Sequence, residues 1–180
     1  MMFNIAEIVD NPYKKIVNEL VLGEYIIKIE GKYKDASPAI IFSIECGIGS
    51  NFSRGTVDMN ISVDKFISEG ILSFAYLEVP CRIQRLGIGS MLMQVVIEIA
   101  KELRVYFKVT SHKIQIRGWL SNVDYKNGNW ERALPFYQKT AKINNVEVLF
   151  IGEASEQTYK RWQDYLIYEA DKDGKVIFNL

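Results

Sequence analysis

The sequence is poor in the residues that build disulfide frameworks and zinc sites. Its 180 residues include two cysteines, Cys46 and Cys81, and a single histidine, His112. Two cysteines and one histidine in unrelated contexts cannot supply the four ligands of a usual structural zinc site, so we expect no metal. A disulfide between the two cysteines remains an alternative. A free buried thiol is the favoured interpretation, because nothing in the sequence points to an oxidising compartment.

Long apolar runs and an excess of charge of one sign are also missing. No stretch approaches the roughly 20 apolar residues of a membrane span, and no secretory signal is visible at the start. Lys and Arg total 22, as do Asp and Glu, so the net charge is zero. Broad electrostatic capture of nucleic acid or of an anionic membrane is therefore not expected. These absences favour a soluble, cytoplasmic protein.

What is present is ordinary globular composition. Hydrophobic residues make up 48% of the chain and charged residues 24%, which excludes disorder. The four prolines are scattered, and no repeat or linker is evident. At roughly 100–200 residues per domain, the length predicts a single domain over residues 1–180.

Hydrophobic periodicity predicts strands first and helices later. Residues 5–21 look weakly helical, although Asn11-Pro12 should break or start a helix. The expected strands cover 24–30, 38–46, 56–63, 71–79, 113–120 and 146–151, with a turn at 31–37. The expected helices cover 91–107, 130–142 and a last segment containing Tyr159, Trp162, Tyr165 and Leu166. The order predicts an α+β fold with a mixed, mostly antiparallel sheet flanked by helices.

Two of these segments carry specific expectations about burial. In 56–63, Val57, Met59, Ile61 and Val63 alternate with polar residues, which indicates a half-buried strand. In 91–107, the apolar residues recur at helical spacing and predict a wide buried face. Its members are Leu92, Val95, Val96, Ile99, Ala100 and Leu103.

The most informative stretch runs from Leu77 to Ser90, where a strand ends, a glycine-containing turn follows and an apolar helix starts. Backbone N–H groups at a helix N-terminus lack internal partners, and the helix dipole favours an anion there. Gly87 and Gly89 let the backbone approach a ligand closely. Ser90 can add a hydroxyl donor, and Arg82 and Arg85 add positive charge.

The identity of the anion is narrowed by what the turn lacks. A dinucleotide fingerprint needs a third glycine, at the position of Leu92, and a phosphate-binding P-loop needs a lysine after Gly89. What remains is Gln84-x-x-Gly87-x-Gly89 directly after a strand. This resembles the [Gln/Arg]-x-x-Gly-x-[Gly/Ala] pattern of the GCN5-related N-acetyltransferases (GNAT family), in which Val79 also stands at the expected distance before Gly87.

A second signature resembles the same family. Residues 129–139 contain Asn129, Ala133, Phe136, Tyr137 and Lys139 in the order of the family's Asn, Ala, Phe/Leu-Tyr-x-Lys helix, and the strand at 116–124 is also similar. The likeness covers residues 71–152 and implies a three-layer α/β arrangement. The sequence departs from the pattern where Lys139-Thr-Ala replaces a Gly-Phe pair, and where no helix pair separates the first two strands.

The resemblance implies acetyl-coenzyme A (acetyl-CoA) as cofactor and assigns roles to named residues. Backbone groups of Leu77–Val79 would pair with pantetheine, with Glu78 between them as candidate general base. Gln84 and the amides of Arg85, Leu86, Gly87, Ile88, Gly89 and Ser90 would hold the pyrophosphate. Asn129 would contact the cofactor arm, or simply cap the following helix. Tyr137 matches the general-acid tyrosine, with a core aromatic as the plainer alternative.

Other residues with reactive side chains have weaker claims. Asp124 is a second candidate base, His112 lies in a polar turn, and Cys81 lacks an indicated base, so we interpret it as packing. Basic residues between Lys101 and Lys113 indicate a solvated face, or contact with the adenosine 3′-phosphate or with an acidic partner. Trp119, Trp130 and Trp162 are expected to be apolar filling.

Three functions remain open from the sequence. The first is an N-acetyltransferase in which an amine attacks the thioester directly in a ternary complex. The second is an inactive acyl-CoA-binding or sensor domain, and the third is a structural domain with a fortuitous turn. The expected partner is a small-molecule or peptide amine, not nucleic acid or a membrane, and a homodimer stays open.

Overall fold

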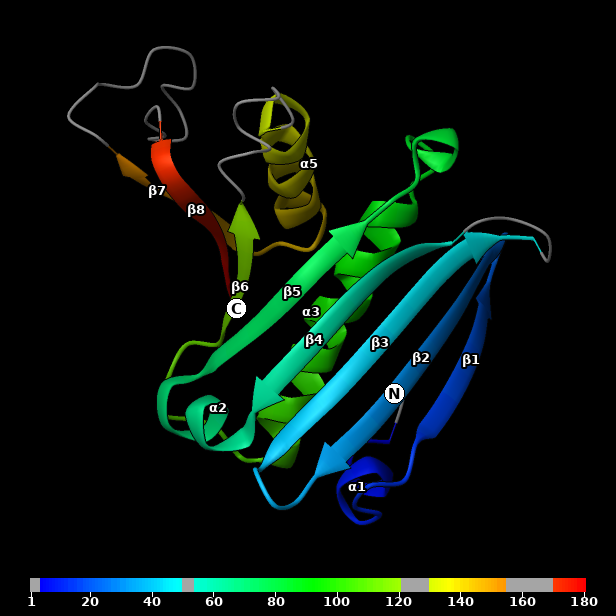
Figure 1. Ribbon diagram of the computed structural model, residues 1–180, viewed down its shortest axis with the longest axis vertical. Helices are drawn as coiled ribbons and strands as arrows, with labels where there is room; N and C mark the ends of the chain where they lie inside the picture. The colour runs from blue at the N-terminus through cyan, green and yellow to red at the C-terminus, as the bar shows by residue number, and fades with distance from the viewer. Residues whose placement is uncertain (1–3, 50–53, 121–129, 155–169) are drawn as a thin grey trace. The chain divides into compact units, whose positions relative to one another are not determined.

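The computed structural model describes residues 4–49, 54–120, 130–154 and 170–180 (Figure 1). The chain divides into two compact units, Met1–Ile114 and Gln115–Leu180. In both units, helical structure packs with antiparallel strands. The predicted α+β class, with a mostly antiparallel sheet flanked by helices, is confirmed.

The first unit is built on a meander of strands that pair in chain order. They are β1 (Ile16–Leu22), β2 (Tyr25–Lys34), β3 (Ala39–Ile48), β4 (Gly55–Ser62) and β5 (Ile71–Glu78). Each is antiparallel to the next. The predicted alternation of β4 is confirmed for Val57, Met59 and Ile61, which are buried while Asp58 and Asn60 are exposed, but Val63 begins α2.

One face of this sheet packs against helices. The long helix α3 (Ile88–Tyr106) contacts β3, β4 and β5, and it crosses behind the strands in Figure 1. The short helix α1 (Ile5–Val9) contacts β2 and α3, and α2 (Val63–Glu69) contacts β4 and β5. All six side chains predicted to form the buried face of α3 are fully buried. Burial of a Val, Leu or Ile side chain contributes about 1.5–3 kcal/mol, so this face anchors the helix firmly.

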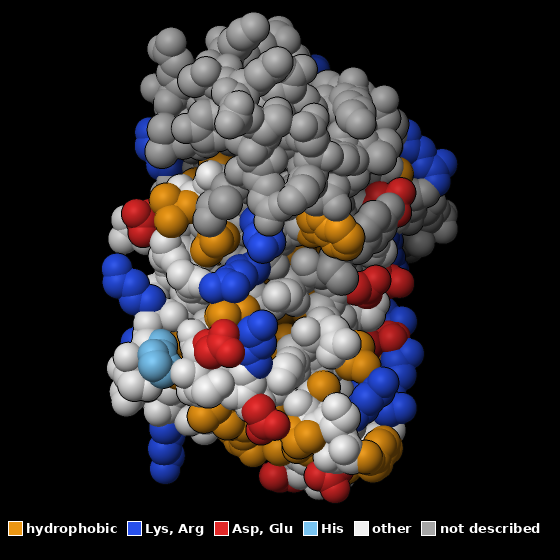
Figure 2. Space-filling view, turned by 60° about the vertical axis from the view of Figure 1, so that its left-hand side comes forward, with side chains coloured by type: hydrophobic (Ala, Val, Ile, Leu, Met, Phe, Trp, Pro, Cys, Tyr) orange, Lys and Arg blue, Asp and Glu red, His pale blue; other side chains and the backbone are white. Residues whose placement is uncertain are grey.

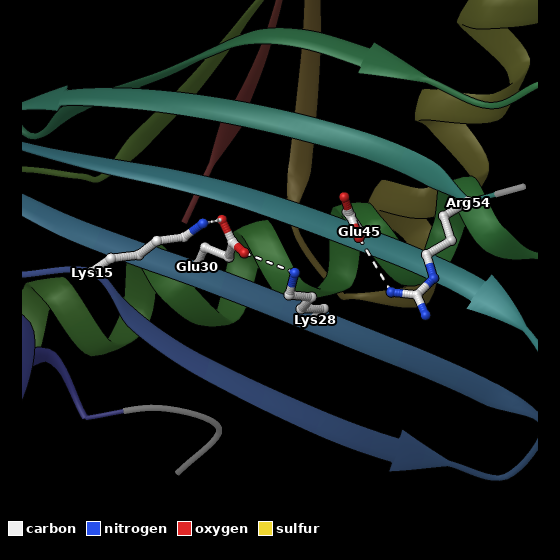
Figure 3. A network of polar contacts seen from close by, with 5 residues as sticks. All are labelled: Lys15, Lys28, Glu30, Glu45 and Arg54. Atoms are coloured by element: carbon white, nitrogen blue, oxygen red, sulfur yellow. Dashed lines mark hydrogen bonds and ion pairs between the residues drawn. The ribbon is translucent and has the colours of Figure 1, made fainter. Parts of the chain in front are cut away.

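The opposite face of the same sheet is polar. Figure 3 shows Lys15, Lys28, Glu30, Glu45 and Arg54 on the side away from α3. Glu30 pairs with Lys15 and, at 2.8 Å, with Lys28, while Arg54 lies 3.2 Å from Glu45. The hydrogen bonds from Lys15 and then Lys28 hold the pKa of the Glu30 carboxyl below its ordinary value. This face thus carries paired charges beside half-buried side chains such as Ile26 and Ile41.

The second unit is smaller and contains one described helix. Its strands are β6 (Gln115–Leu120), β7 (Glu147–Ala154) and β8 (Ala170–Asn179), with β8 between the other two. Both pairings are antiparallel. Helix α5 (Trp130–Ile143) contacts β7. Leu134, Tyr137 and Ala141 of α5 are buried, as are Phe150 and Phe178 of the strands.

The structure corrects the prediction for the N-terminal region. The helix ends at Val9, before Pro12, and residues 16–22 form strand β1 where the sequence pattern predicts a helix over 5–21. Pairing with β2 outweighs the weak helical pattern. Strand β2 also runs through the predicted turn as far as Lys34. Gly31 lies inside this strand, where a Cβ would stand 2.5 Å from Ile8 Cδ1, so the glycine here allows a close approach of α1.

Some elements were not predicted, and the expected burial of one tryptophan was wrong. Helix α2 and strand β8 had no counterpart in the expectations. Trp119 is 66% exposed and not apolar filling, because the alternation of β6 turns Ile116 and Gly118 inward. The side chain of Trp130 and the expected last helix, with Trp162, lie outside the described residues. Among the described helices, none is long and apolar enough to span a membrane.

Candidate functional site

The predicted anion-binding turn lies between β5 and α3 in the first unit, and we call residues 84–90 the 84–90 turn. A short 3₁₀ helix, Cys81–Ile83, leads from the strand into it. Strand β5 carries a β-bulge shortly before: Asp58 of β4 pairs with Tyr76, but Met59 pairs with Phe74, which leaves Ala75 as an extra residue. Bulges bend a strand and re-aim the residues after it, and they are frequent beside functional sites.

The start of α3 differs from the starts of α1 and α2. Asn4 caps α1 by accepting from the Glu7 amide, and Ser62 caps α2 by accepting from the Lys65 amide. Each of those helices also has an acidic residue in its first turn. Helix α3 begins after Gly87, with no side-chain cap and no acidic residue in its first turn. Its positive end is therefore free of the groups that usually neutralise it.

The backbone amides of this helix start are available to a ligand. The first intrahelical bond is donated by Met91 to the Gly87 carbonyl at 3.0 Å. The amides of Ile88, Gly89 and Ser90 precede it, so the helix gives them no partner. Gly87 is exposed and Gly89 and Ser90 are half-buried, whereas the Ile88 side chain is buried and fixes the helix to the core.

The backbone of the turn takes unusual conformations. Arg85 has φ 69° and Gly87 has φ 81°, so left-handed residues stand on both sides of Leu86. Alternation of this kind curls successive N–H groups into a concavity that suits anions. Two side chains brace it: Gln84 Nε2 donates to the Val79 carbonyl at 3.1 Å, and the Tyr25 hydroxyl donates to the Leu86 carbonyl at 3.0 Å.

The predicted cationic and strand residues lie in the turn or next to it in the chain. Arg82 and Arg85 are exposed, and Leu86 is 49% exposed. Leu77 and Val79 are half-buried at the end of β5. Glu78 is exposed and pairs with Thr56, on the sheet face away from α3. The predicted pantetheine contacts and the role of Glu78 as base stay predictions.

Tyr137 belongs to the second unit and lies in α5. Its side chain is 6% exposed, and its ring meets Phe178 of β8 edge to face, with centroids 5.9 Å apart. It therefore takes part in the core, in line with the plainer alternative, and its role as a general acid stays a prediction. Asn129 and Asp124 lie outside the described residues.

The histidine and the cysteines form no described group of metal ligands. His112 is exposed in a turn. Cys46 is a free, fully buried thiol, as expected, and burial raises its pKa to about 11. The side chain of Cys81 is outside the described part of the chain. Among the described residues, no group of three or more His, Cys, Asp or Glu side chains gathers as metal ligands would.

The basic residues near the end of α3 are engaged locally. Lys101 pairs with Glu98 at 2.7 Å, and Arg104 donates to the Val109 carbonyl at 3.2 Å. Figure 2 shows acidic and basic side chains interspersed on the face it presents. This agrees with the zero net charge, since no described surface in that view gathers a field of one sign.

Sequence reasoning missed Tyr25. It is separated from Leu86 by 61 residues, and no local pattern distinguishes it from the other aromatic residues of the strands. The φ of 81° at Gly87 favours a glycine there, and a Cβ at this position would also lie 2.5 Å from the Tyr25 hydroxyl oxygen.

No protein-family model matches the sequence, and no curated protein is significantly similar to it. Among solved structures, the chain is similar to a crystal structure of a "putative acetyltransferase of the GNAT family" from Desulfovibrio desulfuricans. The two share 13% identity, the match covers 78% of this chain and 68% of that chain, and the TM-score is 0.42. A likeness this distant does not assign a function, which has to come from the residues of this chain.

Proposed function

We propose that the protein is an acetyl-CoA-dependent N-acetyltransferase, in which an amine attacks the thioester directly within a ternary complex. The observation that carries this proposal is the 84–90 turn. The family-like Gln84-x-x-Gly87-x-Gly89 stretch follows a bulged strand and opens a helix with no cap and no acidic first-turn residue. Such a helix start suits the diphosphate of coenzyme A.

Binding would divide between the strand end and the turn. The amides of residues 85–90 would hold the diphosphate, with Ser90 and the exposed Arg82 and Arg85 adding donors and charge. Backbone groups of Leu77 and Val79 would pair with the pantetheine arm. When bound, acetyl-CoA supplies an activated acyl group as a thioester. Holding it beside the amine lowers the barrier, by up to about 7–11 kcal/mol when the geometry is ideal.

The chemistry needs a base and an acid. The attacking amine must lose a proton, and Glu78, exposed at the end of β5, is the candidate acceptor for it. The new C–N bond forms as the C–S bond breaks, and Tyr137 would donate a proton to the leaving thiolate. A phenol has an ordinary pKa of about 10 and so keeps that proton at neutral pH.

Calorimetric titration of the purified chain with acetyl-CoA tests the cofactor. Binding is expected, and a thermal shift should accompany it, because a ligand at 100 times its Kd adds about 2.7 kcal/mol of stability. If neither binding heat nor a thermal shift is observed, the proposal is contradicted and the 84–90 turn has only a structural role. Binding without thiol release across a panel of small amines and peptides favours the inactive, acyl-CoA-binding alternative.

The substitution Tyr137→Phe tests the acid. Phenylalanine keeps the ring contact with Phe178, so the fold should persist. Turnover should fall about 100-fold, the size of a general-acid contribution, while acetyl-CoA affinity stays unchanged. Tyr106→Phe, the same change at the last residue of α3, is the matched control and should leave turnover intact. Full activity in Tyr137→Phe would remove this residue from the mechanism.

A further inference from the structure

The 84–90 turn needs support from outside itself. Arg85 has φ 69° although it is not a glycine, and Gly87 has φ 81°. Side chains disfavour the left-handed region, so an isolated segment would leave this conformation for one of several others. The exposure of Gln84, Arg85 and Leu86 means that core packing of these side chains does not hold it.

Tyr25 provides a support that is anchored elsewhere. It is the first residue of β2, where it pairs with Leu22 of β1 and Ile48 of β3. Its backbone is therefore fixed by neighbours on both sides. From that fixed point its hydroxyl donates to the Leu86 carbonyl at 3.0 Å, between the two left-handed residues.

This hydrogen bond determines where an amide points. A trans peptide unit is planar, and its C=O and N–H point in opposite directions. The carbonyl of Leu86 and the amide of Gly87 belong to one peptide unit. That unit is trans, since no cis peptide occurs among the described residues. Holding the carbonyl toward Tyr25 therefore turns the Gly87 N–H away from Tyr25. The hydroxyl also occupies the space where a Cβ at position 87 would lie, at 2.5 Å.

We propose that Tyr25 is a positioning residue of the anion site, whose hydroxyl selects the conformation of the 84–90 turn that presents its amides to a diphosphate. The inference rests on the proposed function, because it assumes that this turn binds the diphosphate of acetyl-CoA. It adds that the β1–β2 hairpin, distant in sequence, controls the affinity of that site.

The substitution Tyr25→Phe removes only the hydroxyl. Tyr13→Phe is a matched control, since the Tyr13 hydroxyl accepts from the Ala36 amide at 2.9 Å near the other end of β2. Both lose one exposed tyrosine-to-backbone bond, so similar small losses in unfolding midpoint are expected. Acetyl-CoA affinity, measured by calorimetry, should fall about 3- to 10-fold in Tyr25→Phe, the effect of one hydrogen bond, and stay unchanged in Tyr13→Phe.

A second probe separates positioning from general loosening of the fold. S-acetylpantetheine carries the thioester arm without the diphosphate, and its binding, followed by ligand-observed NMR, should be equal in wild type and Tyr25→Phe. Equal losses for both probes, or no loss for acetyl-CoA, would overturn the role of Tyr25. A wild-type protein that binds no acetyl-CoA would overturn the proposed function itself, and with it this inference.

Discussion

Helices α2 and α3 both begin shortly after a strand of the same sheet, yet their first turns are built in opposite ways. Helix α2 starts at the end of β4 with Ser62 as its cap and Asp64 in its first turn. Helix α3 starts from Gly87 with neither a cap nor an acid. A capped first turn is complete by itself, whereas the start of α3 leaves donors and positive potential available to a ligand.

The two helices also differ in how much side-chain burial holds them in the fold. Helix α2 covers seven residues, and Val63 and Phe66 are its buried side chains. Helix α3 covers 19 residues and buries many more. A cap contributes about 1 kcal/mol, which is small beside the burial along α3. The longer helix can therefore leave its first turn unsatisfied without losing its place in the fold.

The largest expected effect comes from giving each helix a Cβ at its positive-φ glycine. Gly87 precedes α3 with φ 81°, and Gly70 follows α2 with φ 71°. A Cβ would lie 2.5 Å from the Tyr25 hydroxyl in the first case and 2.6 Å from the Lys113 carbonyl in the second. Gly87→Ala and Gly70→Ala should each destabilise the protein by about 1–3 kcal/mol.

Only one of these variants should also affect binding. Gly87→Ala should weaken acetyl-CoA affinity by more than about tenfold, since strain of this size shifts the turn to other conformations. Gly70→Ala should bind as wild type does at a temperature where both are folded. Chemical unfolding and calorimetry measure the two quantities separately. Equal affinity losses in both variants would contradict the distinction between the two helices.

An acidic residue in the first turn of α3 is expected to raise the stability of the fold and to lower the affinity for acetyl-CoA. Ser90→Asp should raise the unfolding free energy by about 0.3–1 kcal/mol, because a carboxylate there complements the helix dipole. The same carboxylate should repel the diphosphate and weaken acetyl-CoA binding about tenfold. Asp64→Asn in α2 is the control and should lose stability without a change in affinity. Unchanged binding by Ser90→Asp would mean that the diphosphate lies elsewhere.

The smallest effect concerns the polar face of the sheet, away from both helix starts. The pKa of Glu30 is lowered by Lys15 and Lys28, so its charged form stabilises the fold above the ordinary carboxyl pKa of about 4.3. That contribution is lost as the pH falls through the lowered pKa. The free energy of unfolding of Glu30→Gln should therefore depend less on pH between 5 and 3 than that of wild type. The difference should be modest, because the pairs are partly open to solvent.

Glu24→Gln, at the exposed β1–β2 turn, is the matched control for this change and should keep the wild-type pH dependence. Acetyl-CoA affinity at neutral pH should be the same in both variants. A large loss of affinity in Glu30→Gln would show that the polar face, and not only the 84–90 turn, contributes to the site.

The parts of the fold that could be predicted are those in which local pattern and tertiary packing agree. The alternation of Val57, Met59 and Ile61 matched a strand buried on one face, and the spacing of Leu92 to Leu103 matched the buried face of α3. Strand β1 was missed because its stability comes from pairing with β2, which a local helical pattern does not reveal.

The candidate site likewise has one part that could be predicted from the sequence and one part that could not. The 84–90 turn could be located from its glycines and from the strand and helix around it. Tyr25 could not, because its contact with Leu86 joins two segments 61 residues apart. Position 31 illustrates the same limit: Gly31 was expected in a turn, but pairing with Ile16 of β1 and Phe42 of β3 places it inside β2.

The extra residue at position 75 decides which way the end of β5 faces. Side chains alternate along a strand, so one inserted residue exchanges odd and even positions beyond it. Phe74, before the insertion, pairs with the buried Met59, and Leu77, after it, pairs with the buried Val57. With regular pairing, Leu77 would turn to water and Glu78 toward the helices. The carboxylate thus owes its access to solvent to the bulge at residue 75. Deleting that residue would keep Glu78 opposite Thr56, whereas regular pairing with residue 75 retained would turn Glu78 toward the helices.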